Sequence, residues 1–350
     1  MKPHLKKLQN QVMVITGASS GIGLATARQA ARRGAKLVLA CRNEDALNKL
    51  VDEMRGAGHD AIAVRADVGN YADHEAILAA ALERYGRVDT WVNNAGVSIF
   101  GRLTEVAIED QRKLFDTNYW GVVYGSMVAV AHLKKNGGAL INVGSEVSDR
   151  AVPLQGAYSA SKHAVKGFTD ALRMELQDEG APVSVTLIKP AAVNTGFVRH
   201  AKNYLDVEPQ LPPPIYAPEV VADAILFAAE NPERDIYVGG ASKMNSVGGQ
   251  RMPGLMDKMG RMLIRQQRSH VPATQRADAL YQAGEDLTPT ENTTRSVHHH
   301  SAYTHLTTRG RGWVWAGAGL ALGYAVLAAI PKLRSDMAAM PQLRHGAGRY

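Results

Sequence analysis

Short apolar runs alternate with longer amphipathic stretches from residue 11 to about residue 240. The short runs are rich in β-branched residues, as strands are, and the stretches between them have helical periodicity. We expect seven strands, at 11–16, 36–40, 61–68, 88–94, 138–145, 183–190 and 235–240. We expect helices at 21–34, 44–56, 72–85, 105–132, 158–179 and 219–230. Apolar strands joined by crossover helices predict an α/β fold with a doubly wound parallel sheet, helices on both faces and ligands at the strand carboxyl ends.

The pattern changes after residue 240 and predicts a C-terminal helical extension. The expected division is a catalytic domain at 1–245, an amphipathic Met-rich helix at 246–270, a polar linker at 271–310, and a hydrophobic helix with a basic tail at 311–350. The Met-rich stripe fits core packing, and equally a flexible lining for a lipophilic substrate or a partner surface.

The segment 313–330 has eighteen residues without a charge. As a helix it would measure about 27 Å, close to the hydrocarbon core of about 30 Å. Trp313 and Trp315 suit one membrane interface, and Gly319 and Gly323 suit close helix pairing. The segment is rich in Ala and Gly, so a membrane anchor and a helix buried against protein both remain open.

Composition narrows the classes of partner. The chain has 350 residues, of which 45% are hydrophobic, and a net charge of +7. Its single cysteine, Cys41, excludes an internal disulfide and indicates a reducing compartment. No apolar signal segment follows the basic N-terminus, so a cytoplasmic catalytic domain is expected, with a membrane tether if 313–330 is an anchor. No zinc-ligand spacing or base-stacking motif is present, so neither a metal nor nucleic acid is expected.

A glycine-rich turn lies between the first strand and the first helix. Its residues are Thr16, Gly17, Ala18, Ser19, Ser20, Gly21, Ile22 and Gly23. Glycines at such a turn let backbone amides approach a pyrophosphate at the positive end of the helix, which indicates a Rossmann-type dinucleotide site.

The second strand ends in Ala40, Cys41 and Arg42. An NAD site usually has an acidic residue at this place to hold the ribose 2′-hydroxyl. Cys41 replaces it, and the Arg42 guanidinium can pair with a 2′-phosphate. The sequence therefore favours NADP(H) over NAD(H), unless Arg42 is an ordinary solvated residue.

Tyr158 and Lys162 are four residues apart, so they share one face of a helix. A neighbouring ammonium is expected to lower the pKa of the Tyr158 hydroxyl, which would then exchange a proton with a carbinol oxygen. Ser145 ends the fifth strand and could hold the same oxygen. These residues predict the proton half of a ketone–alcohol redox reaction.

In this order the motifs resemble those of the short-chain dehydrogenase/reductase family, over about residues 11–240. The resemblance rests on TGASSGIG at 16–23, Asp67-Val68, Asn93-Asn94-Ala95-Gly96, Asn118, Ser145 and YSASK at 158–162. It implies catalytic roles for Asn118, Ser145, Tyr158 and Lys162. It also implies cofactor contacts from Asp67, Val68, Asn94, Ala95, Gly96, Tyr158, Lys162, Pro190, Val193 and Thr195.

One departure follows the sixth strand, where the family usually has Pro-Gly. Ala191 stands in place of the glycine, and it is tolerated if its φ is negative. The loop 196–216 contains Pro212, Pro213 and Pro214, so it cannot be one regular helix. We interpret it as a lid over the substrate, with a plain surface connection as the alternative.

The sequence thus predicts an NADP(H)-dependent oxidoreductase acting on a ketone or secondary alcohol, with Tyr158 as acid/base. The substrate is a small molecule, and a lipophilic one if 313–330 is an anchor. The alternative is a non-catalytic NADP(H)-binding, redox-sensing module on the same fold. By resemblance, a homodimer or homotetramer is expected through the helices at 105–132 and 158–179.

Overall fold

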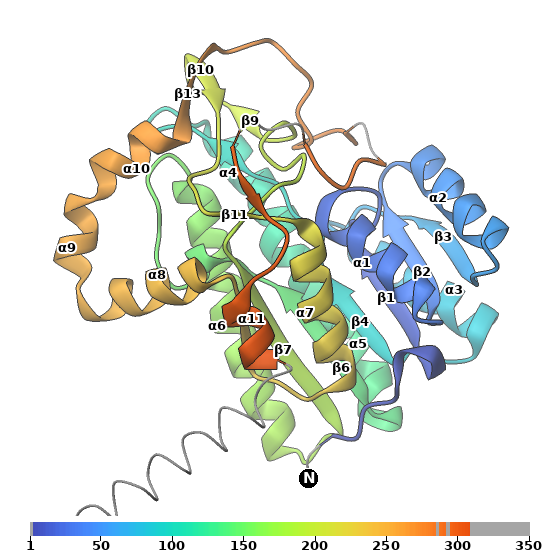
Figure 1. Cartoon of the computed structure of the whole chain (residues 1–350). Coiled ribbons are helices and arrows are strands. Elements are labelled where there is room, and N and C mark those ends of the chain that lie inside the picture. Colours follow the sequence, from blue (N-terminus) through green and yellow to red (C-terminus); the bar gives the residue numbers. More distant parts are fainter. Residues whose placement is uncertain (1–2, 285–286, 292–294, 309–350) are drawn as a thin grey trace, which may run out of the picture. The chain divides into compact units, whose positions relative to one another are not determined.

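A computed structural model describes residues 3–284, 287–291 and 295–308. Its centre is one seven-stranded sheet in which every pairing is parallel. The strand order is β12-β7-β6-β4-β1-β2-β3 (Figure 1). The strands are β1 (Val12–Thr16), β2 (Lys36–Cys41), β3 (Ala61–Arg65), β4 (Thr90–Asn93), β6 (Gly138–Val143), β7 (Val183–Pro190) and β12 (Asp235–Val238).

Helices cover both faces of this sheet. One layer consists of α1 (Gly21–Arg32), α2 (Glu44–Gly56) and α7 (Pro218–Glu230), and the other of α3 (Tyr71–Tyr85), α5 (Gly121–Asn136) and α6 (Gly156–Asp178). In β1, Met13 and Ile15 pack in the first layer, whereas Val12 and Val14 pack in the second. Successive strand residues point to opposite faces, so a continuous apolar run fills both cores. The predicted fold class is confirmed.

The order of strands reverses between β1 and β4, which are neighbours in the sheet. The crossovers leave this point in opposite directions, so a crevice forms at the carboxyl ends of the two strands. The glycine turn follows β1 and the Asn-Asn-Ala-Gly motif ends β4 and continues beyond it. The fold therefore places both motifs at one crevice.

The helix expected at 105–132 is divided into three parts. It consists of α4 (Ile108–Phe115), a π-helical turn over Asp116–Trp120, and α5. Asn118 lies in the π turn, where its side-chain oxygen accepts from the Val97 amide at 2.8 Å and its Nδ2 donates to the Val97 carbonyl at 2.9 Å. A π turn redirects one side chain out of the regular helical register, and such turns are common at functional sites.

Short strands link the loops at the carboxyl side of the sheet. β5 (Ile99–Phe100) pairs with β9 (Lys202–Asn203), and β8 (Ala192–Val193) pairs with β11 (Ile215–Tyr216). β14 (Val297–His298) also pairs with β11, and β10 (Val207–Pro209) pairs with β13 (Arg268–Pro272).

Residues through Thr304 form one compact unit with the sheet. Three helices follow β12: α8 (Gly240–Arg251), α9 (Pro253–Lys258) and α10 (Gly260–Gln267). The stretch expected as one Met-rich helix at 246–270 is divided among these three helices, and β13 begins within it at Arg268. The segment expected as a polar linker at 271–310 contributes the end of β13, β14 and the buried Leu280, and α11 (Ala302–Thr308) comes last. None of the described helices is both long and apolar enough to span a membrane. The hydrophobic segment at 313–330 and the basic tail lie outside the described residues.

Candidate active site

The glycine turn after β1 is shaped by close backbone contacts. Gly17 has φ +65°, and a Cβ on it would lie 2.8 Å from the Ala95 Cα. A Cβ on Gly23 would lie 2.0 Å from the Gly17 carbonyl oxygen. Asn94 Nδ2 donates to the Thr16 carbonyl at 2.9 Å, while the Thr16 hydroxyl accepts from the Asn94 amide at 3.0 Å. Glycine is required here because the two loops touch.

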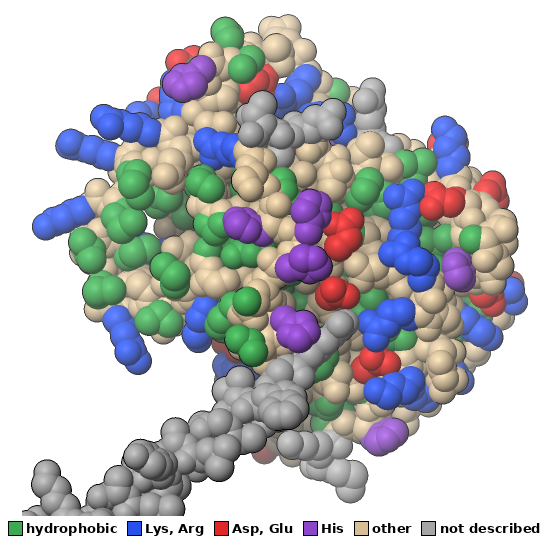
Figure 2. Space-filling model, viewed as in Figure 1, with side chains coloured by type: hydrophobic (Ala, Val, Ile, Leu, Met, Phe, Trp, Pro, Cys, Tyr) green, Lys and Arg blue, Asp and Glu red, His purple; other side chains and the backbone are tan. Residues whose placement is uncertain are grey.

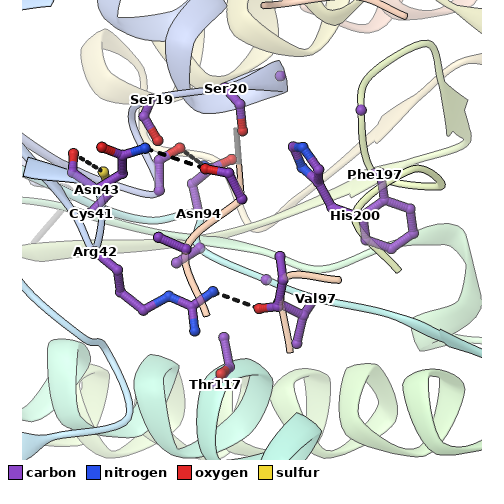
Figure 3. Close-up of a pocket in the computed structure, with 18 of the residues that line it drawn as sticks. Ser19, Ser20, Cys41, Arg42, Asn43, Asn94, Val97, Thr117, Phe197 and His200 are labelled. Atoms are coloured by element: carbon purple, nitrogen blue, oxygen red, sulfur yellow. Dashed lines mark hydrogen bonds between the residues drawn. The ribbon is translucent and has the colours of Figure 1, made fainter. Parts of the chain in front are cut away.

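A pocket opens between these loops, which we call the glycine-loop pocket (Figure 3). Most of the predicted cofactor residues line it: Gly17, Ser19, Ser20, Gly21, Ile22, Arg42, Asp67, Val68, Asn94, Ala95, Gly96 and Thr195. Thr16 and Gly23 do not line it and instead support the turn from behind. The pocket has the form of a dinucleotide cradle in which an added Cβ would collide with backbone.

Arg42 extends across this pocket, opposite His200 and Phe197 (Figure 3). Its Nη2 donates to the Ala279 carbonyl at 2.5 Å. Its Nη1 is buried and has no hydrogen-bond partner among the described residues. A buried guanidinium nitrogen without a partner is costly, and an anionic ligand oxygen would satisfy it.

The C-terminal segment forms part of the wall of this pocket, a contribution that the sequence analysis missed. Ala279, Ala283 and Gly284 line the pocket. The Leu287 amide donates to the Ser19 carbonyl at 2.8 Å, and the Gly21 amide donates to the Thr288 carbonyl at 3.3 Å. No motif marks this segment, because its position depends on these long-range backbone contacts.

A second pocket, which we call the Tyr158 pocket, adjoins the first. Ile22, Asn94, Gly96, Thr195 and Phe197 line both pockets. The predicted residues Ser145, Tyr158, Lys162, Pro190 and Val193 all line the Tyr158 pocket. Tyr158 is buried, and its ring packs edge-on against Phe197 at a centroid distance of 5.3 Å.

The proton chemistry of this pocket differs from the sequence prediction in one respect. Burial raises the pKa of the Tyr158 hydroxyl, and the negative charge of Glu146 raises it further, while its hydrogen bond with Ser145 opposes the rise. Burial also lowers the pKa of Lys162 to about 8. The net shift of the Tyr158 pKa is therefore upward, opposite to the direction that the sequence predicted, because desolvation is its largest cause.

Lys162 is held by the end of the fifth predicted strand. Its Nζ donates to the Val143 carbonyl at 2.8 Å and lies 5.8 Å from the centre of the Tyr158 ring. A Cβ on Gly96 would lie 3.4 Å from Asn118 Oδ1 and 3.8 Å from Lys162 Nζ, so both side chains approach Gly96. Asn118 itself is fully buried and also donates to Ser161 Oγ at 3.1 Å.

The Pro-Ala departure after β7 leaves the wall of the pocket intact. Positive φ among the described non-glycine residues occurs only at Leu154 and Leu287, so Ala191 keeps the negative φ that the sequence analysis required. Thr195 packs against the glycine turn, since a Cβ on Gly21 would lie 3.1 Å from the Thr195 Cβ. Phe197, Leu211 and Pro212, all from the predicted lid, line the Tyr158 pocket.

Glu146 is a pocket residue that sequence reasoning missed, although it directly follows Ser145. Burial raises the pKa of its carboxyl to about 7, and a hydrogen bond from Asn245 lowers it. Asn245 Nδ2 donates to Glu146 Oε2 at 2.6 Å and comes from α8, outside the family motifs. The residue type alone gave no signal, because a glutamate after a strand is usually solvated.

Residues 11–205 match the family model described as short chain dehydrogenase. The uncharacterized oxidoreductase YxnA of Bacillus subtilis is 51% identical over 288 residues, which is 81% of each chain. The 11-beta-hydroxysteroid dehydrogenase-like protein 4A of Arabidopsis thaliana is 39% identical over 195 residues, covering 55% of this chain and 64% of the relative.

Solved structures give the same result. A short-chain dehydrogenase/reductase from Burkholderia phymatum in complex with NAD has a TM-score of 0.64 and 32% identity, covering 72% of this chain and 97% of that one. An alcohol dehydrogenase from Thermococcus sibiricus complexed with 5-hydroxy-NADP has a TM-score of 0.57 and 30% identity, covering 65% and 95%.

Proposed function

Because the chain belongs to the short-chain dehydrogenase family, and is thus an oxidoreductase that uses a nicotinamide cofactor on a small molecule, we propose that it interconverts a ketone and a secondary alcohol. The observation that carries the proposal is the convergence of Ser145, Tyr158 and Lys162 on one pocket that adjoins the glycine-loop pocket. When bound, the nicotinamide supplies or accepts the hydride at the substrate carbon.

The side chains of the Tyr158 pocket would manage the proton at the substrate oxygen. Ser145 and Tyr158 share a hydrogen bond, so their hydroxyl groups are close enough to contact the same substrate oxygen. Lys162 would hold the nicotinamide ribose and replenish the tyrosine proton, since burial brings its pKa to about 8. Asn118 would act on Lys162 from beside Gly96, which both side chains approach.

We further propose that the rate of carbonyl reduction is highest at neutral pH and below, and that the rate of alcohol oxidation rises at alkaline pH. Burial and the Glu146 charge raise the pKa of Tyr158, so its hydroxyl stays protonated and is ready to donate. Alcohol oxidation requires the tyrosinate, which becomes populated only at more alkaline pH.

NADP(H) is the cofactor that the glycine-loop pocket supports better. Cys41 stands where an acidic residue would repel a 2′-phosphate, and Arg42 Nη1 is a buried donor without a partner among the described residues. The structural relatives include complexes with NAD and with an NADP derivative, so the preference rests on this chain's own residues.

The substrate side of the Tyr158 pocket is largely apolar. Val147, Val152, Phe197, Leu211 and Leu263 line it, with Glu146, Gln155 and Gln267 as polar exceptions. Such a wall suits a hydrophobic ketone that carries one additional polar group. A hydroxysteroid dehydrogenase-like relative is consistent with a substrate of this kind.

The experiment is a panel of ketones, from small aromatic to long-chain and polycyclic compounds, with NADPH oxidation followed at neutral pH. We expect turnover with apolar ketones, and the reverse reaction with the matching alcohols and NADP⁺ at higher pH. Absence of turnover across the panel in both directions, with NADPH bound to the protein, would contradict the proposed reaction.

A further inference from the structure

Five large apolar side chains project into solvent from the three helices that follow the sheet and from the single residues that join these helices. They form what we call the α8–α10 surface: Met244, Met252, Leu255, Met259 and Met262. Their exposed fractions range from 37% at Met259 to 74% at Met244. Figure 2 shows hydrophobic side chains gathered over this region, on the left of the molecule. Scattered exposed apolar residues are ordinary, but a contiguous group marks an interaction surface.

Basic side chains surround this apolar group. Five Lys or Arg residues lie in α8–α10, against Asp257 as the only acidic residue. Asp257 is already paired with Arg150. Arg251, Lys258, Arg261 and Arg265 have no ion-pair partner in the part of the chain that the structure describes. Blue side chains accordingly stand at the edge of the apolar group in Figure 2.

An apolar groove connects the α8–α10 surface with the Tyr158 pocket. Met256, Met259, Leu263 and Ile264 line this groove from the helix side. The groove and the Tyr158 pocket share Glu146, Val152, Pro212 and Leu263 in their walls. Met259 therefore belongs both to the exposed surface and to the groove that leads inward.

We propose that the α8–α10 surface docks on an anionic lipid bilayer. Its methionine and leucine side chains would enter the interfacial layer, and its arginine and lysine side chains would contact lipid phosphates. Apolar side chains with a basic rim are the combination that holds a helix in the plane of a membrane interface. The groove would then open toward the layer in which apolar ketones concentrate.

A bilayer explains this surface better than protein or nucleic acid does. A second copy of the chain would bring the same cations against these cations, because a twofold contact pairs identical surfaces. Nucleic acid would account for the charge but not for four exposed methionines and a leucine, since single strands stack on aromatic side chains. The proposal is independent of residues 313–330, which lie elsewhere in the sequence, and of the reaction at Tyr158.

The test uses the full chain with an environment-sensitive fluorophore attached through Leu255→Cys. The native Cys41 is buried, and labelled wild-type protein measures any background from it. Leu82→Cys is the matched control, because Leu82 is 36% exposed on α3, which lies on the other side of the molecule from α8–α10 in Figure 1. Vesicles contain phosphatidylcholine alone or mixed with phosphatidylglycerol.

We expect a blue shift of the label at position 255 with the mixed vesicles, little with phosphatidylcholine, and none at position 82. Binding through residues 313–330 alone would leave the label at 255 in water, so an unshifted label overturns the proposal. Equal shifts at both positions also overturn it. A shift that appears without vesicles and grows with protein concentration would instead identify a second copy as the partner.

A charge variant tests the basic rim separately. Each cation near an anionic membrane accounts for roughly fivefold in partitioning, so Arg251→Gln with Arg261→Gln should raise the lipid concentration for half-maximal shift by roughly 25-fold. The control pair Arg28→Gln with Arg84→Gln removes the same charge from α1 and α3 and should change it little. Equal effects of the two pairs would show that net charge, and not this surface, is responsible.

Discussion

Replacing Arg42 with alanine should convert a cofactor preference into near indifference. The side chain offers two nitrogens to the glycine-loop pocket: Nη2 is held by the Ala279 carbonyl, and Nη1 is buried without a partner among the described residues. A 2′-phosphate would give Nη1 a charge-assisted hydrogen bond. NADH has no 2′-phosphate, so it would not give Nη1 this hydrogen bond.

The size of the effect follows from the value of one such bond. A hydrogen bond to a charged group contributes about 1.5–3 kcal/mol, which corresponds to roughly 10- to 150-fold in kcat/KM. We therefore expect Arg42→Ala to lower kcat/KM for NADPH by that factor. We expect kcat/KM for NADH to change by less than about threefold, which is the size of effect that most surface substitutions have. The loss of the bond to Ala279 affects both cofactors, so the ratio is the informative quantity.

The assay is initial-rate NADPH and NADH oxidation with one saturating ketone, for the wild type, Arg42→Ala and Arg42→Lys. The lysine variant keeps the charge but loses the planar fork, so it should retain an intermediate preference. Equal use of both cofactors by the wild type would refute the reasoning. So would a parallel loss with both cofactors in Arg42→Ala, which would assign Arg42 to the packing of the C-terminal segment.

Three further predictions concern the site and its support. Burial raises the pKa of Glu146 to about 7, so this carboxyl gains its negative charge as pH rises through neutrality. The titration should add an inflection to the pH profile of kcat/KM, and Glu146→Gln should lack that inflection. Lys189 and Asp149 form a buried ion pair with an N–O distance of 3.1 Å. Lys189→Met would leave the Asp149 charge buried without this partner, and it should lower the free energy of unfolding by about 3 kcal/mol in urea denaturation. Adding Asp149→Leu should restore part of the lost free energy. Gly23→Ala would place a Cβ 2.0 Å from the backbone of the glycine turn, and it should weaken NADPH binding by at least about tenfold in a fluorescence titration. In Gly167→Ala, where nothing lies within 4 Å of the added Cβ, the same titration should give the wild-type affinity.

The sheet was predictable because its strands are short apolar runs with turns between them. The expected strand at 36–40 corresponds to β2 (Lys36–Cys41), and that at 183–190 to β7. The strand expected at 61–68 ends at Arg65, since the following residues leave the ladder to shape the pocket at Asp67. Local pattern determines these elements, and neighbouring strands only adjust their ends.

Elements that depend on distant partners were not predictable. The π turn at Asn118 exists because that side chain is fixed to the backbone of Val97, twenty-one residues away. β13 is formed by pairing with β10, and nothing in the polar sequence around Arg268 indicates a strand. The contribution of Ala279 and Gly284 to the glycine-loop pocket has the same origin.

The site was predictable in its members but not in its electrostatics. Helical spacing places Tyr158 and Lys162 on one face, and the structure brings both to one pocket with Ser145. Spacing contains no information on depth, and burial is what raises the pKa of Tyr158 and lowers that of Lys162. The homo-oligomer and the membrane anchor at 313–330 stay predictions.

The central claim is that Tyr158 donates the proton to the carbonyl oxygen during hydride transfer. Single-turnover oxidation of bound NADPH by a ketone, compared between the wild type and Tyr158→Phe, tests it most directly. The variant keeps the ring against Phe197 and lacks only the hydroxyl. We expect the rate of the chemical step to fall by about 10²- to 10⁴-fold, the range for a lost general acid, with the NADPH dissociation constant unchanged. A chemical step in Tyr158→Phe as fast as that of the wild type would contradict the account.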